Sequence, residues 1–288
     1  MERTVLGPGR RPAAPLLVAA ACAGGLVVVY ALFVHTTVGQ RVDNAALLGR
    51  AAVPQGLVDD AWGILDTISL VALAAASLAV GLVALIQGRV RQAFGAGVIL
   101  LGANVTTQVL KRVILTRPEL VRDDAIPFNS LPSGHATVAM SVAIAALVVV
   151  PAARRPLVAL LGTGYAVAVG VSTLVAGWHR PSDAVAAYLV VGAWAALVAP
   201  FAGDRAPSGR TRMEALLWMG SAAMVLGVLA GGAALAGVTA SSEFTEFAGF
   251  GRRSLAFLSA ALGIAATATT VTAMVMGMLR SPWPARRP

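Results

Sequence analysis

The chain has 288 residues, of which 58% are hydrophobic and only 12% are charged, and its mean hydropathy is +0.80. Because soluble domains are nearer half apolar and a quarter charged, this composition indicates an integral membrane protein. The net charge of +9 does not indicate nucleic-acid binding, because the arginines form short clusters between apolar runs rather than a basic stripe. The single cysteine, Cys22, lies inside an apolar run, which excludes a disulfide framework and a thiolate metal site.

Eight apolar segments are long enough to cross the hydrocarbon core of a membrane, for which about 20 helical residues are needed. In chain order they are Leu16–Val34, Trp62–Ile86, Ala93–Leu110, Ala136–Ala153, Leu157–Trp178, Ala184–Gly203, Ala215–Ala240 and Leu255–Leu279. The sequence therefore predicts an all-α integral membrane fold with eight spans. We expect a six-helix core in residues 1–203. Residues 204–288 then add two C-terminal transmembrane helices and a basic tail.

The distribution of basic residues predicts which side of the membrane each connection faces. The chain ends and the connections after the second, fourth and sixth spans carry 13 basic and three acidic residues, whereas the other connections carry nine of each. Because lysine and arginine are enriched on the cytoplasmic side, both termini are predicted to be cytoplasmic. The connections between spans three and four and between spans five and six then face outward from a plasma or inner membrane.

Polar clusters lie in or beside these two outward connections. The first is Pro132-Ser133-Gly134-His135, directly before an apolar span. Proline and serine favour a helix start, whose unpaired N–H groups and positive dipole end form an anion site. Gly134 would let a phosphate approach the backbone, and His135 could donate a proton to a leaving oxygen. The same four residues also fit an ordinary helix start with an interfacial histidine.

The second cluster is His179-Arg180-Pro181-Ser182-Asp183, where Pro181 again begins a helix. Asp183 lies one helical turn from His179. A carboxylate bonded to one ring nitrogen fixes the tautomer and leaves the other nitrogen free to attack an electrophile. The alternative is an interfacial His–Asp pair that only caps the next helix.

The third cluster contains Lys111, the only lysine of the chain, and Arg117-Pro118. Arginine can hold phosphate oxygens in a fork, and lysine acts as a point charge. A basic loop attracted to anionic lipid head groups is the alternative. Four polar residues that precede the lysine either line the same site or bond neighbouring helices: Asn104, Thr106, Thr107 and Gln108.

Together the three clusters predict one site above a single helix bundle. Two histidines with separate acid and nucleophile roles suit phosphoryl transfer. Metal binding by the histidines and the aspartate is disfavoured, because Lys111, Arg117 and Arg180 would repel a cation. We therefore expect catalysis without a metal ion or another cofactor.

These motifs resemble the type 2 phosphatidic acid phosphatase (PAP2) superfamily, which includes membrane lipid phosphatases and shares a pocket with vanadium haloperoxidases. Its members carry a lysine followed by Arg-Pro, then Pro-Ser-Gly-His, then Ser-Arg followed by His and, four residues later, Asp. The resemblance covers roughly residues 101–191 and, through the number of helices, the six-helix core.

The resemblance implies a role for each motif residue. His179 would attack phosphorus to form a phosphohistidine, Asp183 would orient it, and His135 would be the general acid. The residues expected to bind phosphate are Lys111, Arg117, Ser133 and Gly134.

The chain departs from the family pattern at two points. Five residues, rather than six, separate Lys111 from Arg117. Thr173 stands where the family has the arginine that follows Ser172, so one phosphate ligand is missing, and Arg180 or Arg122 could replace it. Losing one charge-assisted contact would cost about 1.5–3 kcal/mol of oxyanion binding.

The sequence thus predicts a membrane phosphatase that acts on a lipid phosphate or diphosphate at the extracytoplasmic face. Phosphatidic acid and polyprenyl diphosphate are the two substrate classes that we expect, and membrane lipids are the expected partners. One alternative is a phosphotransferase that uses the same intermediate. The other is a non-enzymatic lipid-handling or transport protein on the same scaffold, which would be expected to place polar residues near the membrane centre.

Overall fold

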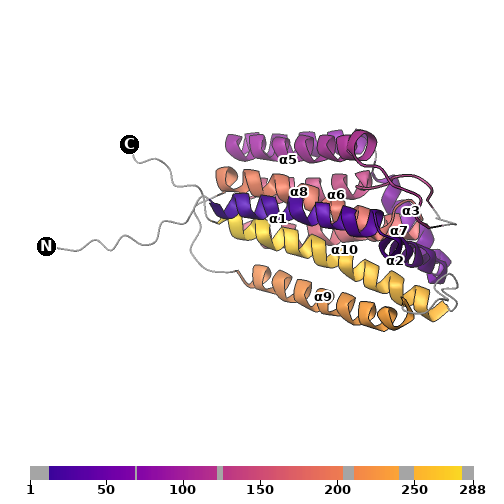
Figure 1. The fold of residues 1–288 in the computed structure, drawn as a ribbon. Coiled ribbons are helices and arrows are strands. Elements are labelled where there is room, and N and C mark those ends of the chain that lie inside the picture. The colour runs from indigo at the N-terminus through magenta and orange to yellow at the C-terminus, as the bar shows by residue number, and fades with distance from the viewer. Residues whose placement is uncertain (1–12, 69, 122–125, 204–210, 240–249, 281–288) are drawn as a thin grey trace.

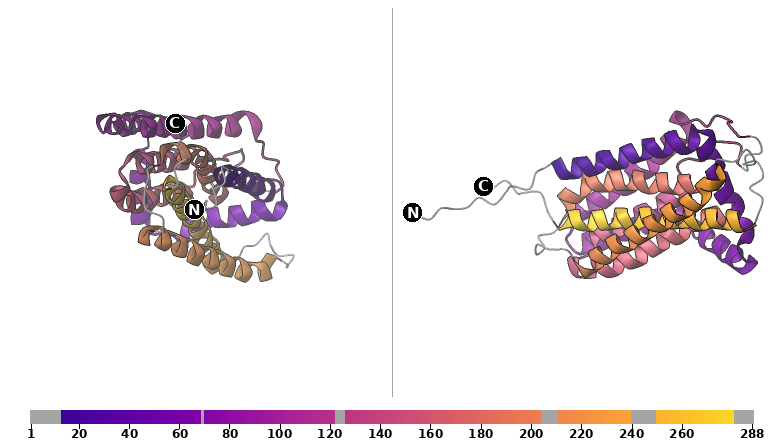
Figure 2. Two further views of the ribbon diagram at one scale, coloured as in Figure 1. Left: turned by 90° about the vertical axis from the view of Figure 1, so that its left-hand side faces the viewer. Right: turned by 60° about the horizontal axis from the view of Figure 1, so that its bottom comes forward.

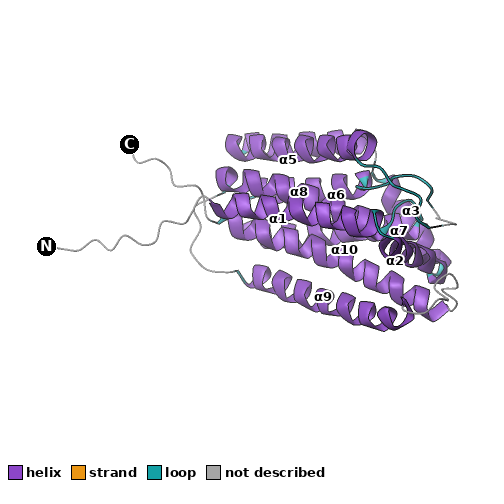
Figure 3. Ribbon diagram, in the orientation of Figure 1, coloured by secondary structure: helices purple, strands orange, loops and turns teal. Residues whose placement is uncertain are grey.

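The computed structural model describes residues 13–68, 70–121, 126–203, 211–239 and 250–280, and in these ranges every regular element is helical (Figures 1 and 3). The α-helices are α1 (Ala13–Val29), α2 (Thr37–Leu48), α3 (Gln55–Asp66), α4 (Leu70–Ile86), α5 (Val90–Val109), α6 (Gly134–Val149), α7 (Arg155–Val175), α8 (Pro181–Ala202), α9 (Arg212–Thr239) and α10 (Phe250–Leu279). Wider π-helical turns extend two of them, η1 (Tyr30–Val34) after α1 and η3 (Leu110–Ile114) after α5. Short 3₁₀ turns are η2 (Gly49–Ala52) and η4 (Ala152–Arg154).

Six helical segments of the described chain are long and apolar enough to cross a membrane. They are Ala14–Val34, Val90–Ile114, Ala152–Val175, Pro181–Ala202, Arg212–Gly232 and Gly251–Leu279. Each corresponds to one predicted span. For the described residues, the prediction of an all-α fold with helices apolar and long enough to span a membrane is therefore confirmed.

The other two predicted spans form shorter helices. The predicted span Trp62–Ile86 is interrupted, because α3 ends at Asp66 and α4 begins only at Leu70. The Thr67 hydroxyl donates a hydrogen bond to the Ile64 carbonyl at 2.6 Å, and the Ile68 amide bonds to Leu65 three residues back. These bonds tighten the last turn of α3 and end it. The single span over this range was therefore wrong, and Trp62 belongs to a separate helix.

The fourth predicted span, Ala136–Ala153, ends early. α6 has 16 residues and stops at Val149, because Pro151 disfavours helical backbone at the residue before it. At 1.5 Å per residue, α6 is about 24 Å long, less than a usual hydrocarbon core. The predicted total of eight crossings is therefore not confirmed and stays a prediction.

Helix α8 lies at the centre of the bundle, with α1, α5, α6 and α10 packed around it. Tyr188, Val191 and Ala195 of this helix are fully buried. Small residues allow the close approach, since Gly192 faces Cys22 of α1 and Gly102 faces the ring of Trp194. The end-on view of Figure 2 shows α5 and α9 at opposite edges of the bundle.

Helix α10 belongs to the same core rather than lying beside it. Its Thr272 accepts a hydrogen bond from Thr163 of α7 at 2.9 Å, and its Ile264 and Ala268 are fully buried. Helix α9 is tied to it through Ser221, which donates to the Ala266 carbonyl at 3.3 Å. The division of the chain at residue 203 stays a prediction.

The start of α1 and the end of α10 lie at one end of the bundle (Figure 1). At the opposite end lie α2, α3 and the loop before α6, together with His135 and His179; we call it the histidine end. The membrane orientation stays a prediction. Several residues counted for it lie outside the described residues, among them Arg3, Arg10, Arg11, Arg205, Arg210, Arg286 and Arg287.

The packing predicts that Gly170 of α7 cannot be enlarged. A methyl group there would lie 2.8 Å from a methyl of Ile264 and would also collide with the Tyr188 hydroxyl. We expect Gly170→Ala to cost about 1–3 kcal/mol and to lower the melting temperature in detergent. Gly164→Ala on the same helix is the control, since nothing lies within 4 Å of that position. Equal melting temperatures for the two variants would contradict this account of the core.

Candidate active site at the histidine end

The first turn of α6 forms one side of the site. Ser133 is the N-cap, and its hydroxyl oxygen accepts a hydrogen bond from the Ala136 amide at 3.4 Å. Gly134 and His135 follow as the first helical residues, so their amides belong to the positive end of the helix. Such an end can bind an anion, as the sequence predicted, provided that cationic side chains or other groups converge there.

The first turn of α8 forms the other side, and Asp183 organises it. One carboxylate oxygen, Oδ2, accepts the Arg180 amide at 2.9 Å and faces Nδ1 of His179 at 3.0 Å. His179 is 5% exposed and Asp183 is 1% exposed, so this pair is shielded from water. Because the carboxylate occupies Nδ1, the other ring nitrogen, Nε2, is left for chemistry.

The two helix starts are joined directly. The Ser133 amide donates a hydrogen bond to the Asp183 carbonyl at 2.9 Å. The ring centroids of His135 and His179 are 6.4 Å apart. Lys111 interacts electrostatically with both His135 and Asp183. The structure thus brings the predicted lysine, both histidines and the aspartate to one place.

Lys111 lies in the π-helical turn η3 at the end of α5. Its backbone carbonyl accepts a hydrogen bond from the Asn129 side chain at 3.2 Å, which ties the turn to the loop before α6. The polar residues before it mainly join helices. Thr107 bonds to Thr137 at 2.9 Å, Asn104 donates to Ser141 at 3.1 Å, and Thr106 accepts from Trp194 at 3.1 Å.

Arg117 lies in the loop between η3 and α6, and its side chain is partly buried. Tyr30 holds the residue before it, because the Tyr30 hydroxyl donates to the Thr116 carbonyl at 2.9 Å and accepts the Thr116 amide at 3.1 Å. Gln40 of α2 holds the residue after it by donating to the Pro118 carbonyl at 2.8 Å. The backbone around Arg117 is therefore fixed on both sides.

Arg180 is buried, with 1% of its surface exposed. Its guanidinium donates to the Ser130 hydroxyl at 3.0 Å and to the Ile126 carbonyl. These contacts fix the loop before α6 against the start of α8. The role of Arg180 as a phosphate ligand stays a prediction, and Arg122, the other predicted substitute, lies outside the described residues.

Thr173 supports the loop that carries His179, residues 176–180, through its backbone carbonyl. Its carbonyl accepts the amides of Trp178 at 3.0 Å and His179 at 3.2 Å, while its hydroxyl donates to the Gly170 carbonyl at 2.8 Å. The side chain is fully buried and uncharged. Gly177 in the same loop has a φ of +76°, a conformation that favours glycine, and the Arg50 guanidinium lies against it.

Trp178 is a site residue that the sequence did not single out. Its ring lies 5.2 Å from the His135 ring and 4.8 Å from that of Trp62, measured between centroids. It therefore forms an aromatic wall beside the predicted general acid.

Asp43 was also missed. It lies in α2, is 1% exposed, and accepts hydrogen bonds from the Ser182 amide at 3.2 Å and from the Ser182 hydroxyl. Burial, and after it the nearby charge of Asp183, raise the pKa of Asp43 to about 7, although Ser182 and Arg180 oppose the shift. Its partner is distant in sequence, so only the polar pattern of α2 could have signalled it.

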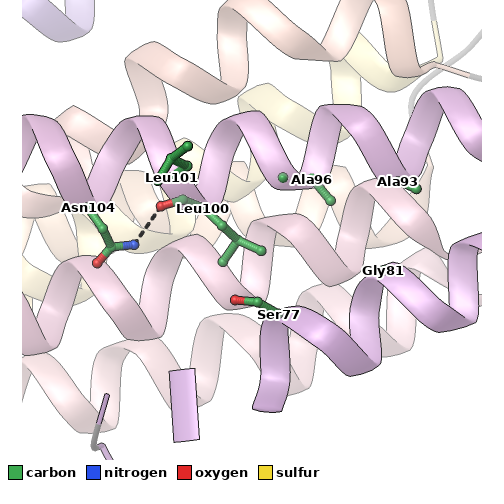
Figure 4. Close-up of a pocket in the computed structure, with 8 residues that line it drawn as sticks. Ser77, Gly81, Ala93, Ala96, Leu100, Leu101 and Asn104 are labelled. Atoms are coloured by element: carbon green, nitrogen blue, oxygen red, sulfur yellow. Dashed lines mark hydrogen bonds between the residues drawn. The ribbon is translucent and has the colours of Figure 1, made fainter. Parts of the chain in front are cut away.

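A cleft of about 350 Å³ lies between α4 and α5, away from the histidines. Its walls are mainly apolar and small, and include Ala96, Gly97 and Leu100, with Ser77 on the α4 side (Figure 4). Asn104 closes one end, where its side chain donates to the Leu100 carbonyl at 2.8 Å. Lys111 follows Asn104 by seven residues, about 10 Å further along the same helix.

In the part of the chain that the structure describes, no group of three or more histidine, cysteine, aspartate and glutamate side chains is arranged to hold a metal ion. The cationic neighbours of the histidine pair are suited to an anion instead.

Comparison with known families matches the model of the PAP2 superfamily to residues 67–207 of the chain. The matched range begins at the end of α3 and contains every predicted site residue, from Lys111 to Asp183. Comparisons with curated proteins and with solved structures give no match.

Asp43 makes stability depend on pH in a defined direction. The folded chain holds a proton on Asp43 up to about pH 7, whereas the unfolded chain releases it near the ordinary value of 3.8. The resulting stabilisation is complete below the lower pKa and is lost as the pH rises through the higher one. We expect Asp43→Asn to reduce the loss of stability between about pH 5.5 and about pH 8.5 by about 2 kcal/mol, because about 1.5 pH units of this interval lie below the folded pKa. The measurement is a smaller fall in melting temperature across the interval. Asp59→Asn, at an exposed site on α3, should leave the fall unchanged. An equal fall in wild type and Asp43→Asn would contradict the prediction.

Proposed function

Because the chain belongs to the PAP2 superfamily, whose members are generally phosphatases, we propose that it is a membrane phosphatase that hydrolyses a lipid phosphate or diphosphate. The observation that carries the proposal is the His179–Asp183 hydrogen bond of 3.0 Å beside His135 and Lys111. That pair presents one free ring nitrogen to a site bounded by a second histidine and a cation.

The chemistry follows from these positions. Nε2 of His179 attacks phosphorus and forms a phosphohistidine, while the bond from phosphorus to the lipid oxygen breaks. His135 donates a proton to that leaving oxygen and later accepts one from the water that attacks the phosphohistidine. Inorganic phosphate leaves, and His179 is regenerated. Asp183 stabilises the positive charge that the His179 ring carries while it is bonded to phosphorus.

The oxygens of the phosphoryl group require positive partners. Lys111 and Arg117 supply charge. The first turn of α6, which begins at Gly134 after the Ser133 cap, supplies backbone N–H groups and the helix dipole. Arg180 contributes a further positive charge from the start of α8. No metal ion or cofactor is needed for any of these steps.

The apolar surroundings support a lipid substrate. The cleft between α4 and α5 ends at Asn104, about 10 Å along α5 from Lys111. A substrate whose head group lies at Lys111 could place its tail in this cleft. Phosphatidic acid and polyprenyl diphosphate both have such a tail. The excess of basic residues on the connections away from the histidine end favours the extracytoplasmic face for the reaction.

Phosphate release by the purified protein in detergent tests the proposal. We expect release from phosphatidic acid or undecaprenyl diphosphate in excess EDTA, inhibition by vanadate, and a loss of at least roughly 10³-fold in His179→Ala. His35→Ala is the matched control, because His35 is exposed and packs against Tyr30 instead. Activity that survives His179→Ala would refute the assigned nucleophile.

Other outcomes of the same assay separate the alternatives. Formation of a new phosphate ester on an added alcohol, in place of inorganic phosphate, would indicate a phosphotransferase. No release from either lipid would favour a lipid-handling protein without enzymatic activity.

The position of the substrate tail can be tested at Gly97. Gly97 lines the cleft, and nothing lies within 4 Å of a Cβ added there, so we expect the side chain of Gly97→Leu to extend into the cleft. We expect the KM for a long-chain lipid phosphate to rise three- to tenfold, because the lost burial of one or two methylenes is worth about 1 kcal/mol. The KM for a short-chain, water-soluble phosphate ester should stay unchanged. Gly164→Leu, on an open face of α7, is the control, and equal effects of the two variants would contradict the assignment.

A further inference from the structure

Helix α2 buries polar side chains where an interfacial helix would be expected to bury apolar ones. Gln40, Asp43 and Asn44 share one face, at positions i, i+3 and i+4, and they are 0%, 1% and 6% exposed. A buried polar group is costly unless it is hydrogen-bonded. The partners of these side chains therefore show what the helix holds.

Gln40 holds the loop that carries Arg117. Its side-chain amide donates to the Val34 carbonyl and to the Pro118 carbonyl, both at 2.8 Å. Its side-chain oxygen accepts the Leu120 amide at 3.3 Å. The buried side chain of Gln40 thus uses both of its donors and its acceptor. Two of the three bonds are made to Pro118 and Leu120, which lie just after Arg117 in the chain.

Asp43 holds the first turn of α8. Both of its oxygens are used by Ser182, one by the amide at 3.2 Å and the other by the hydroxyl. Ser182 lies between Pro181 and Asp183 in the chain. Helix α8 therefore receives a cap from outside itself, directly beside the carboxylate that orients His179.

The surroundings leave Asp43 few other partners. A cavity of about 180 Å³ lies beside Asp43 and Ser182, and the walls that α1, α9 and α10 give it are apolar or small apart from Ser259. The charged groups that act on Asp43 are Asp183 and Arg180, both at the start of α8. The contacts of the Asp43 carboxylate thus lie at the start of α8, beside His179.

We propose that α2 is a positioning element of the active site, in which Gln40 fixes Arg117 for phosphate binding and Asp43 fixes the turn that aims His179. The inference rests on the proposed phosphatase reaction and adds two residues to it. Neither side chain touches the reacting atoms, and each acts through another residue. Because misplacing a catalytic group by about 1 Å can cost roughly 10²-fold in rate, such support is functionally significant.

The two residues should affect different kinetic constants. Asp43→Ala should lower kcat by about 10- to 100-fold and change KM less than about threefold, because the aim of His179 is lost while phosphate contacts remain. Asp43→Asn keeps one acceptor for the Ser182 amide and should recover part of that loss. Recovery would not be expected if the carboxylate itself transferred a proton.

Gln40→Glu tests the other half of the proposal. The variant has nearly the same shape and keeps the acceptor for Leu120, but it loses both donated bonds. We expect KM and the inhibition constant for vanadate to rise about tenfold, with kcat reduced less than about threefold. Asn44→Ala is the matched control, since Asn44 is buried on the same face, and it should leave both constants near wild type.

A double-mutant cycle checks that Asp43 acts through Ser182. The effects of Asp43→Ala and Ser182→Ala on kcat should be non-additive, so that the double variant is little worse than Asp43→Ala alone. Additive effects would overturn this part of the proposal. Equal effects of Asn44→Ala and Asp43→Ala would overturn it as well, since they would indicate a general loss of packing.

The outcome for wild type separates this inference from the proposed function. If wild type releases phosphate and His179→Ala does not, but Asp43→Ala and Gln40→Glu are fully active, only the positioning role is wrong. If wild type releases no phosphate from either lipid, the proposed function itself fails.

Discussion

The arrangement of the histidine end depends on the bonds made by one residue, Asp183. Its carboxylate bonds to His179 and to the Arg180 amide, and its backbone carbonyl accepts the Ser133 amide at 2.9 Å. These bonds connect the two helix starts and orient one ring between them. In an apolar bundle such a carboxylate is tolerated only where its oxygens are satisfied, so the need to pair Asp183 is also what assembles the site.

The need to satisfy buried polar groups also explains the contacts made by the residues around Asp183. Arg180 is buried and donates to Ser130 and Ile126, which fixes the loop before α6. Asp43 accepts both hydrogen bonds of Ser182, and Gln40 bonds the loop after Arg117. Each buried polar side chain therefore joins segments that are far apart in the chain. Bonds between distant segments hold the side chains of the site in fixed positions. Fixed positions are what a reacting group and the ligands of a phosphate require.

Much of the fold could be predicted because lipid imposes a simple rule on sequence: apolar runs of sufficient length form helices. That rule failed at Thr67, where side-chain and backbone bonds to the preceding turn end α3 inside a continuous apolar run. It also gave no account of α2, which is too short and too polar to resemble a span. The motif residues were found because their spacing is local. Asp43 was not, because its partner Ser182 is 139 residues away.

The sequence by itself determined the helical membrane character, the candidate residues and the pairing of His179 with Asp183, since all of these follow from composition or from spacing within one turn. Only the tertiary structure decided which distant groups support them. It set Trp178 against His135 and bonded the Thr173 carbonyl to the backbone amide of His179. It also brought α2 against the loop after Arg117 and against the first turn of α8. These contacts depend on how helices pack in three dimensions. Hydrophobic length specifies that a helix exists, but not which neighbour satisfies its buried polar groups.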